Sequence, residues 1–474
     1  MAEGFGRFSV GLARSVATLP ADALSEETRA AGRRVILDAF ACALAGSEVD
    51  VGTLAEAASA PALAGAGAAT LLASGQRTAP AHAAFVNGGH VHALNFDANG
   101  ASGGHVGLVA LAPVLAAAES RSIAVSGAEL LTASLLAGEV AERLARAARS
   151  GGGEIHGRRD GGWLLGQVIG YLAAACGAAR VLCLDPEATL SALGLALMQT
   201  AGTKQVMIEG DAPAKGLYGA FACLGGVLAA TLAAGGVDAR MSALEGDAGL
   251  MPVFFELGEE ALAGALDGFG EEWSAGSAAL KRWPASGVVQ PYVDAALRLA
   301  GRAALSASEL SAVRITAAPA ERDWLEPAAA RRQPQNASAA ANSIAFGVAC
   351  ALAHGALRIA DLRAGAGPLG GAEVAALLAA TAHTFDGEPA VEVVTAAGAA
   401  HREPLAPRNE ERLDGEALAD KLTAANAASV APRPAGELDR LVAAVEGLDA
   451  LPDVRGLFAT PPTGRVVGQF QSSN

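Results

Sequence analysis

A chain of 474 residues is longer than a single small core requires, and its length predicts two domains. Hydrophobic residues make up 52% of it and charged residues 18%, a composition that excludes a disordered chain and allows a large buried core. The formal net charge of −15 excludes a basic stripe of the kind that neutralises phosphates, so we expect no nucleic-acid partner.

Helical patterning dominates the first 274 residues. Apolar residues recur at helical spacing, and the abundant alanines favour helix intrinsically. Turns that contain Gly, Asp or Pro separate the predicted helices, which span residues 8–48, 51–65, 77–94, 106–119, 127–148, 163–182, 186–204, 213–234 and 258–267. We therefore expect residues 1–274 to form the first part of a large all-helical domain.

The pattern changes after about residue 275. This part of the chain combines helical patterns with short β-branched runs that predict strands. The strands are predicted at 313–316 and 391–395, and the helices at 287–301, 338–354 and 372–381. The mixture predicts a smaller α+β domain over residues 275–402.

Helical patterning resumes near the C-terminal end, at 414–427 and 434–447. Residues 403–474 are therefore expected to return to the helical domain. The predicted fold class is mainly α, with one large all-helical domain and one smaller α+β domain.

The most polar segment of the chain is 86–105, which holds three histidines, three asparagines and one aspartate within an apolar region. Gly100, Gly103 and Gly104 would let the backbone approach a ligand closely. A polar, glycine-rich loop between buried helices is typical of a functional site. Asn and Asp side chains that merely cap helices would produce the same pattern, so both interpretations stay open.

A metal site is an alternative interpretation of His90, His92, Asp97 and His105. His90 and His92 are two residues apart, so on one helix they would face different directions. The sequence contains no HExxH motif and no paired cysteines. We therefore expect neither a metal nor another cofactor.

Two lysine-containing segments are further candidates. Lys215 precedes a long apolar helix, a position where a cation is electrostatically unfavourable, although a surface lysine would also fit there. Lys281 and Arg282 precede an apolar, aromatic turn and would either bind an anion or lie at the surface.

Taken in order, these segments resemble the MmgE/PrpD family, whose members include 2-methylcitrate dehydratase and cis-aconitate decarboxylase. The resemblance runs from about residue 8 to residue 450 and rests on the order and spacing of several blocks. These blocks are the helix at 37–47, His92-Ala-Leu-Asn-Phe-Asp97 with the later His105, the helix at 193–202, and the segments 244–249 and 281–297.

The resemblance implies a large helical domain and a smaller α+β lid, with the active site between them, usually in a homodimer. It also implies cofactor-free chemistry on a small-molecule substrate. A base takes a proton next to a carboxylate, water or carbon dioxide is lost, and hydrogen-bonding or cationic groups stabilise the developing charge.

Several positions of the family site differ in this chain. Asn95 stands where the family has the first Asp of its acidic loop, and Asn99 where Thr is common. Leu164 takes the place of a histidine. The carried-over positions are catalytic His105 and Lys215, and substrate-binding Asn95, Asp97, Asn99, Trp163, Leu164, Tyr218, Lys281, Gln290 and Phe346.

Four of these substitutions remove titratable or hydrogen-bonding groups or weaken them. Gln290 and Tyr218 replace two further histidines of the family, and Phe346 replaces a lid tyrosine. Leu164 cannot transfer a proton, and Gln290 can form hydrogen bonds but cannot titrate. A tricarboxylate would leave buried charge poorly paired, at a cost on the order of several kcal/mol. The substrate is therefore expected to be less charged.

Three functions are compatible with these residues. The first is a lyase or isomerase, repurposed for example for cyclisation in specialised metabolism, in which His105 is the general base or acid. Lys215 and the loop asparagines would stabilise negative charge. The second is a conventional 2-methylcitrate dehydratase or cis-aconitate decarboxylase that uses other groups, such as His156 or His90. The third is a non-catalytic homologue that binds a ligand.

The sequence also predicts a cytoplasmic location. The N-terminus lacks the basic and apolar regions of a signal peptide. The apolar runs at 108–117 and 168–182 fall short of the roughly 20 apolar residues that a membrane span requires. Five scattered cysteines favour reduced thiols over disulfides.

Overall fold

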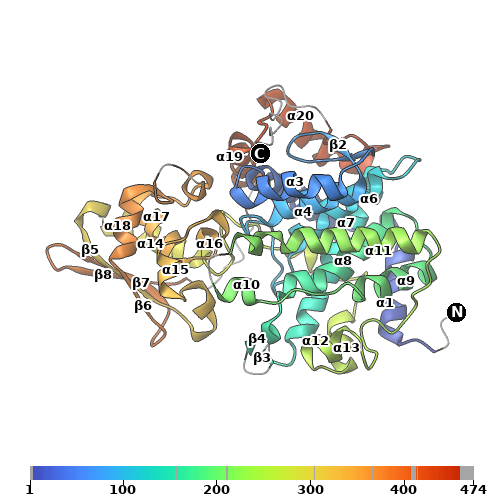
Figure 1. The fold of residues 1–474 in the computed structure, drawn as a ribbon, viewed down its shortest axis with the longest axis horizontal. Helices are drawn as coiled ribbons and strands as arrows, with labels where there is room; N and C mark the ends of the chain where they lie inside the picture. The colour runs from blue at the N-terminus through green and yellow to red at the C-terminus, as the bar shows by residue number, and fades with distance from the viewer. Residues whose placement is uncertain are drawn as a thin grey trace, which may run out of the picture.

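The computed structural model describes residues 4–152, 154–155, 158–209, 212–303, 305–363, 365, 367–406, 413 and 415–459. Two lobes lie side by side, a larger helical body and a smaller lobe that contains a β-sheet (Figure 1). The predicted fold class, mainly α with a smaller α+β part, is confirmed. We call the part from residue 290 to residue 404 the sheet lobe and the rest the helical body.

Five long helices form the centre of the helical body. They are α2 (Glu26–Gly46), α4 (Pro80–His92), α7 (Gly127–Arg149), α8 (Leu165–Val181) and α11 (Tyr218–Ala234). Small residues allow them to approach one another closely. A β-carbon at Gly226 would lie 2.4 Å from the β-carbon of Ala174, so α8 and α11 could not pack this closely around a larger residue.

Shorter elements complete the body. The helices are α1 (Arg7–Thr18), α3 (Asp50–Leu63), α5 (Val106–Ala110), α6 (Ala112–Glu119), α9 (Pro186–Leu197), α10 (Gln205–Ile208), α12 (Leu250–Phe255) and α13 (Glu259–Leu266). The 3₁₀ turns are η1 (Ala21–Ala23), η2 (Asp160–Gly162), η3 (Pro213–Leu217) and η4 (Ala275–Ser277). Two antiparallel pairs join β1 (Ala69–Thr70) to β2 (Arg77–Thr78) and β3 (Glu154–Ile155) to β4 (Arg158–Arg159).

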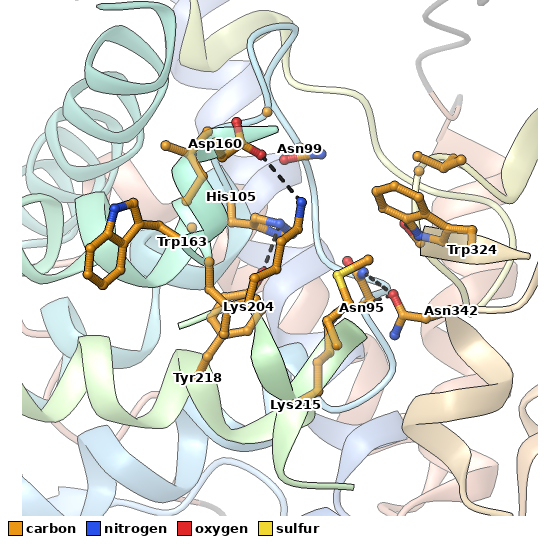
Figure 2. Close-up of a pocket in the computed structure, with 18 of the residues that line it drawn as sticks. Asn95, Asn99, His105, Asp160, Trp163, Lys204, Lys215, Tyr218, Trp324 and Asn342 are labelled. Atoms are coloured by element: carbon orange, nitrogen blue, oxygen red, sulfur yellow. Dashed lines mark hydrogen bonds and ion pairs between the residues drawn. The ribbon is translucent and has the colours of Figure 1, made fainter. Parts of the chain in front are cut away.

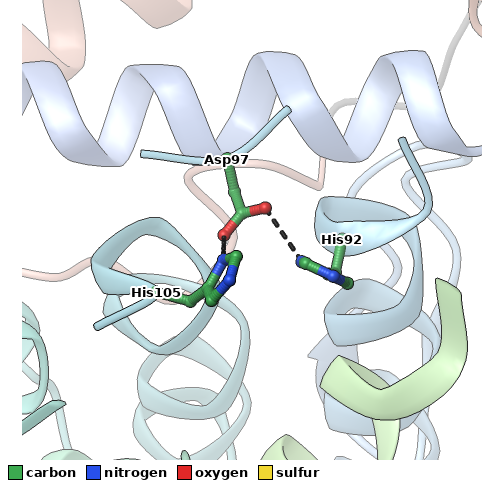
Figure 3. A group of neighbouring side chains, drawn as sticks. All are labelled: His92, Asp97 and His105. Atoms are coloured by element: carbon green, nitrogen blue, oxygen red, sulfur yellow. Dashed lines mark hydrogen bonds and ion pairs between the residues drawn. The ribbon is translucent and has the colours of Figure 1, made fainter. Parts of the chain in front are cut away.

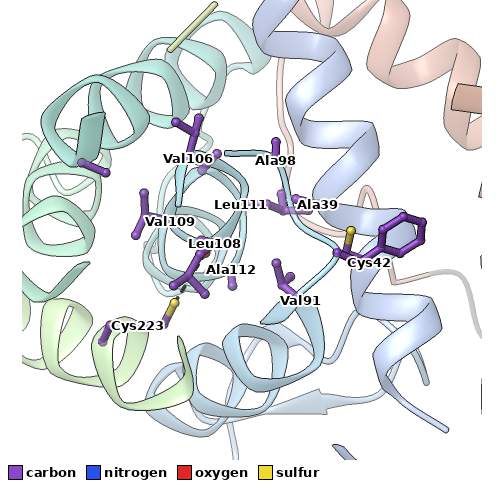
Figure 4. Close-up of a cluster of buried hydrophobic side chains, with 14 of the residues drawn as sticks. Ala39, Cys42, Val91, Ala98, Val106, Leu108, Val109, Leu111, Ala112 and Cys223 are labelled. Carbon is purple, nitrogen blue, oxygen red and sulfur yellow. Dashed lines mark hydrogen bonds between the residues drawn. The ribbon is translucent and has the colours of Figure 1, made fainter. Parts of the chain in front are cut away.

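The short helix α5 lies inside the body, surrounded by α2, α4 and α11 (Figure 4). All of its residues are buried, and Leu108 is completely inaccessible to solvent. The sequence predicts one helix over 106–119, but the structure interrupts it at Leu111, just before Pro113. Because α5 begins directly after His105, the core fixes the position of this histidine.

The sheet lobe contains four strands in the order β6-β5-β7-β8. Their bounds are β5 (Leu310–Thr316), β6 (Thr381–Thr384), β7 (Ala390–Thr395) and β8 (Ala400–Pro404). The pair β5–β6 is parallel and the other two pairs are antiparallel. The sequence did not predict the edge strands β6 and β8, because both are short and polar and lack the β-branched runs of β5 and β7.

Helices pack around this sheet and connect it to the body. They are α14 (Gln290–Ala303), α15 (Ala328–Arg332), α16 (Ala337–Ala341), α17 (Ile344–His354) and α18 (Gly371–Ala379), with the turns η5 (Ala307–Glu309), η6 (Pro319–Trp324) and η7 (Ile359–Leu362). The sequence predicts one helix over 338–354, whereas the structure breaks it at Asn342, and the side chain of Ser343 caps α17.

The C-terminal helices α19 (Gly415–Ala428) and α20 (Ala435–Glu446), followed by η8 (Leu448–Ala450), lie against the helical body rather than the sheet lobe (Figure 1). Both pack against α2. The domain boundaries after residues 274 and 402 stay predictions.

Within the described part of the chain, one helical stretch is long and apolar enough to cross a membrane. This stretch, Pro213–Ala234, has 22 residues, and 61% of an apolar 18-residue window within it is buried inside the protein. A core helix of a soluble protein satisfies the same criteria, and one such stretch is weak evidence for a membrane span. The cytoplasmic location stays a prediction.

Candidate active site

Two histidines share one buried carboxylate in the polar segment of the helical body (Figure 3). His92 ends α4, His105 directly precedes α5, and Asp97 lies in the loop between them. Nδ1 of His92 lies 2.9 Å from one oxygen of Asp97, and Nδ1 of His105 lies 2.8 Å from the other. The carboxylate therefore orients both rings.

The charge states of this group follow from burial. Burial lowers the pKa of His105 and lowers that of His92 to about 3, so both imidazoles are neutral at pH 7. Burial alone would raise the pKa of Asp97, but the nearby His105, His92 and Lys281 hold it well below its ordinary value. An ionised Asp97 accepts hydrogen bonds from both Nδ1–H groups, which leaves Nε2 of His105 as an acceptor.

Tyr218, the first residue of α11, occupies that acceptor. Its hydroxyl lies 2.9 Å from Nε2 of His105. Burial and the charge of Asp97 raise the pKa of Tyr218 well above its ordinary value, so the phenol keeps its proton and donates a hydrogen bond to the imidazole. We call Asp97, His92, His105 and Tyr218 the histidine relay.

A second cluster joins the two lobes through amide groups. The ammonium of Lys215, in η3, donates to Oδ1 of Asn342 at 3.2 Å. Nδ2 of Asn95 donates to the same oxygen at 3.0 Å, and Lys281 donates to the backbone and side-chain oxygens of Asn95 at 2.7 and 3.1 Å. We call these four residues the amide cluster.

Burial makes Lys215 an unusual lysine. Burial, together with the neighbouring charge of Lys281, lowers the pKa of Lys215 to about 7. Lys215 therefore gains and loses its proton near neutral pH.

The backbone of Asn95 is left-handed (φ 50°), a conformation that asparagine tolerates better than most residues.

Members of the relay and of the cluster line one pocket between the lobes, with a volume of about 160 Å³ (Figure 2). His105, Tyr218, Lys215, Asn95 and Asn342 all contribute to its wall. The other walls come from residues of both lobes, among them Asn99, Trp163, Leu164, Met207, Ser286, Val288 and Trp324. A base-competent imidazole and a titratable ammonium thus face the same pocket.

Charged residues of the pocket wall link the lobes as well. The ammonium of Lys204 lies 3.9 Å from a carboxylate oxygen of Asp160 in the body and 3.3 Å from one of Asp323 in η6. Asp160 also lies 3.4 Å from the guanidinium of Arg149. These ion pairs balance the charge of Lys204, whereas Lys215 binds a neutral amide.

The model of the MmgE/PrpD N-terminal domain matches residues 10–261, more than half of the chain. This chain belongs to the MmgE/PrpD family. The match contains His92, Asp97, His105, Lys215 and Tyr218, so the complete histidine relay lies within it.

Curated relatives of this MmgE/PrpD protein match over shorter stretches. The cis-aconitate decarboxylase-like protein oryM of Aspergillus oryzae is 32% identical over 224 residues, which cover 46% of this chain and 44% of the relative. The cis-aconitate decarboxylase of Aspergillus terreus is 27% identical over 299 residues, which cover 60% of this chain and 57% of the relative. The chain thus matches only about half of the length of these relatives.

Not every carried-over position of this MmgE/PrpD protein lies at the pocket. Gln290 instead accepts from the backbone of Trp283 at 3.0 Å and donates to the carbonyls of Trp283 and Ala285, so it holds a turn together. The residues of this segment that line the pocket are Ser286, Gly287 and Val288. Phe346 is completely buried in α17 and belongs to the core.

Asp97 and Lys281 lie behind the residues that line the pocket. They act on it through His105 and Asn95, to which they are hydrogen bonded. His90 is buried and bonds the carbonyl of Gly52 at 3.2 Å, and His156 lies outside the described residues.

The sequence interpretation missed Asn342, Lys204 and Ser286. Asn342 interrupts what looked like one continuous helix, and an Asn-Ser pair at such a position signals a break and a new cap. Lys204 and Ser286 carry no local signal, because only the docking of the two lobes brings them to the pocket.

Two groups of potential metal ligands occur among the described residues. In each group, His92 with Asp97 and His105, and Cys350 with His354 and Asp361, the ligand atoms lie within 4.8 Å of one another. In the first group both Nδ1 atoms already bond Asp97. In the second, Arg358 binds both oxygens of Asp361 at 3.2 and 2.8 Å. Hydrogen bonds in the first group and an ion pair in the second thus explain why these ligand atoms lie close together without a metal ion. The expected lack of a metal stays a prediction.

Proposed function

We propose that this protein is a cofactor-independent lyase or isomerase that moves a proton next to a carbonyl or carboxylate of a small molecule. The observation that carries the proposal is the neutral His105, oriented by Asp97 and facing a pocket shared with Lys215. Membership of the MmgE/PrpD family and the names of its decarboxylase relatives support a lyase-type reaction.

The proton transfer uses the two sides of the pocket differently. Two paths lead the proton from carbon to His105. In the first, the hydroxyl of Tyr218 turns away and Nε2 of His105 takes the proton directly. In the second, the oxygen of Tyr218 takes the proton from carbon while its own proton passes to Nε2 of His105. Asp97 stabilises the imidazolium that forms. Lys215 and Asn95 stabilise the negative charge that develops on the carbonyl oxygen.

The fate of the electron pair decides between the two reaction types. In an isomerase the proton returns to a different carbon, and no group is lost. In a lyase that eliminates water, the electron pair of the enolate-like intermediate forms a carbon–carbon double bond. At the same time the hydroxyl group leaves the neighbouring carbon and takes up a proton, so that it departs as water. Tyr218, which keeps its proton at neutral pH, is placed to act as the acid.

The pocket walls favour a substrate with fewer charges than a tricarboxylate. Trp163, Leu164, Met207, Val288 and Trp324 contribute apolar surface. Lys204 is balanced by carboxylates, so Lys215 is the cation that we assign to the substrate. One carboxylate or carbonyl oxygen next to Lys215 satisfies this arrangement.

A conventional decarboxylase or dehydratase is the second candidate, and the names of the curated relatives favour it. It requires the pocket to bind a tricarboxylate although Leu164 and Ser286 line it. Rapid turnover of cis-aconitate or 2-methylcitrate would establish this candidate and contradict the less charged substrate.

The test is deuterium incorporation in D₂O, measured by mass spectrometry over a panel of small mono- and dicarboxylic acids and ketones, with cis-aconitate and 2-methylcitrate included. We expect exchange or product with a less charged acid in the wild type and none in His105→Ala. His401→Ala in β8 is the matched control and should behave as the wild type. Full activity of His105→Ala would overturn the proposed role, and ligand binding without exchange would favour a non-catalytic homologue.

The homodimer implied by the family resemblance is part of the same proposal. Phe221, Leu228 and Leu232 are 45%, 44% and 38% exposed and share one face of α11, a surface suited to a second copy of the chain. Light scattering during size-exclusion chromatography should give a dimer for the wild type and a monomer for Leu228→Glu. A monomeric wild type would contradict it.

A further inference from the structure

A second cavity adjoins the pocket on the side of α14. Its volume is about 540 Å³, against about 160 Å³ for the pocket that contains His105. Apolar walls come from Leu280, Trp283, Pro291, Leu297 and Leu413. We call this space the side cavity; of the histidine relay and the amide cluster, only Lys281 lines it.

The two cavities share part of their walls. Asn99, Gly100, Ala101 and Gly287 line both. At Gly287 a β-carbon would have only Asn99 and Lys281 within 4 Å, each at 3.9 Å, so the space beside this residue is open. The missing side chain of Gly287 therefore leaves room at the junction of the pocket and the side cavity.

Three polar side chains along the side cavity are engaged by the protein itself, whereas Oδ1 of Asn99, at the junction with the pocket, is buried without a hydrogen-bond partner among the described residues. Lys281 donates to Asn95, and Gln290 bonds the turn that contains Trp283. The indole N–H of Trp283 donates to Asp294 at 2.8 Å. The middle of the cavity thus offers mainly hydrocarbon and aromatic surface, which favours an apolar occupant.

The outer end of the side cavity is more polar. Arg282 and Arg298 line it and are exposed, and Arg298 pairs with Glu403 at 3.0 Å. An apolar chain that enters from the pocket would therefore meet apolar walls first and charged groups only at the solvent side.

We propose that the substrate carries an extended apolar chain, with its reacting head group in the pocket and its chain in the side cavity. This proposal rests on the proposed function, which places the head group between His105 and Lys215. The chain passes Gly287 and Asn99 and packs against Leu280, Leu297 and Trp283. The substrate class is accordingly a carboxylic or keto acid with an alkyl or acyl substituent.

The experiment uses straight-chain carboxylates from butanoate to dodecanoate as probes and measures Kd by isothermal titration calorimetry. In the wild type, each added CH₂ should tighten binding by about fourfold until the side cavity is filled, because burial of one methylene contributes about 0.8 kcal/mol. In Gly287→Leu the gain per added CH₂ should fall well below fourfold, because the leucine side chain fills the junction that a longer chain must pass.

Two further variants make the result specific. Gly301→Leu adds the same side chain to α14 at an exposed position with open space around it, and it should keep the wild-type dependence on chain length. Lys215→Met removes the cation assigned to the head group and should weaken all probes by a similar factor.

The outcomes separate this proposal from the proposed function. An equal dependence on chain length in the wild type and in Gly287→Leu would overturn the side cavity as the chain site, and so would a wild type without any such dependence. If the dependence is lost in Gly287→Leu while no acid undergoes exchange in D₂O, the side cavity stands and the proton-transfer proposal fails.

Discussion

The histidine relay and the amide cluster both contribute residues to the same pocket but differ in where their residues come from. His92, Asp97, His105 and Tyr218 all belong to the helical body, and the first three lie within 14 residues of one another in the sequence. The amide cluster combines Asn95, Lys215 and Lys281 of the body with Asn342 of the sheet lobe.

This difference separates two requirements of the proposed reaction. The group that moves the proton is held in place by one lobe, whatever the position of the other. The group that stabilises charge is complete only when the lobes dock. Changes within the relay should therefore affect proton transfer itself, and changes in the amide cluster should affect ligand binding and the docking of the lobes.

The largest effect is expected from Asp97→Asn. A carboxylate has two acceptor oxygens, but an amide has only one, so it cannot accept from both Nδ1–H groups with separate oxygens. Nδ1 of His105 then loses its strong acceptor, and the tautomer with its proton on Nδ1 and a lone pair on Nε2 is no longer favoured. The rate of deuterium exchange should fall by about 10²–10⁴-fold.

Histidine ¹⁵N NMR provides an independent measurement for this variant. In the wild type the proton of His105 should reside on Nδ1, and in Asp97→Asn a substantial fraction should move to Nε2. An unchanged tautomer together with an unchanged rate would show that the relay does not depend on this carboxylate.

Lys421→Met tests what holds the relay loop in the helical body. Lys421 of α19 is buried, and its ammonium donates to Asp38 at 2.5 Å and to the carbonyl of Phe96 at 3.0 Å. Asp38 in turn accepts from the backbone N–H of Ala98 at 3.1 Å. Loss of one partner leaves a buried carboxylate unpaired, so the free energy of unfolding should fall by about 3–5 kcal/mol.

Urea denaturation measures this loss. The exposed Asp420→Ala on the same helix is the control and should change stability by less than about 0.5 kcal/mol. The double variant Asp38→Leu with Lys421→Met should recover much of the loss, because it removes both charges. A fully stable Lys421→Met protein would contradict the importance of the pair.

Lys215 should make both stability and ligand binding depend on pH. Its pKa is lowered from 10.5 to about 7 in the folded protein, so between these values the unfolded chain binds a proton that the folded chain has lost. The contribution of Lys215 to stability therefore rises with pH from about 7 to about 10.5. Below about pH 7 Lys215 is charged in the folded protein, and there the burial of its ammonium lowers the free energy of unfolding most.

We expect the melting temperature of Lys215→Met to exceed that of the wild type by more at pH 6 than at pH 9. Butanoate affinity should follow the opposite course in the wild type, with weaker binding as the pH rises through about 7 and Lys215 loses its charge. A Lys215→Met protein with the same pH dependence of Kd would refute the assignment.

The smallest effect is expected from Asn342→Ala. This change removes the oxygen that accepts from both Lys215 and Asn95, and buried donors without an acceptor cost about 1–3 kcal/mol. Unfolding in urea should show this loss, and deuterium exchange should slow far less than in Asp97→Asn. A loss of exchange as large as in Asp97→Asn would show that charge stabilisation and proton transfer are not separable.

The sequence by itself determined the helical body and the core of the relay. Periodic apolar residues specify α2, α7 and α11 because a helix is formed by neighbours in the chain. His92, Asp97 and His105 could likewise be assigned to one site, since a short polar loop between buried helices keeps them close together. The β-branched runs of β5 and β7 similarly predicted the centre of the sheet.

Tertiary structure alone decided the rest, because the remaining contacts join residues far apart in the chain. The bond from Tyr218 to His105 spans 113 residues, and that from Lys215 to Asn342 spans 127. Gln290 looked like a pocket residue but closes a turn, while Ser286, four residues earlier, lines the pocket. Local sequence specifies which elements form, and the docking of the lobes decides which of their side chains share a pocket.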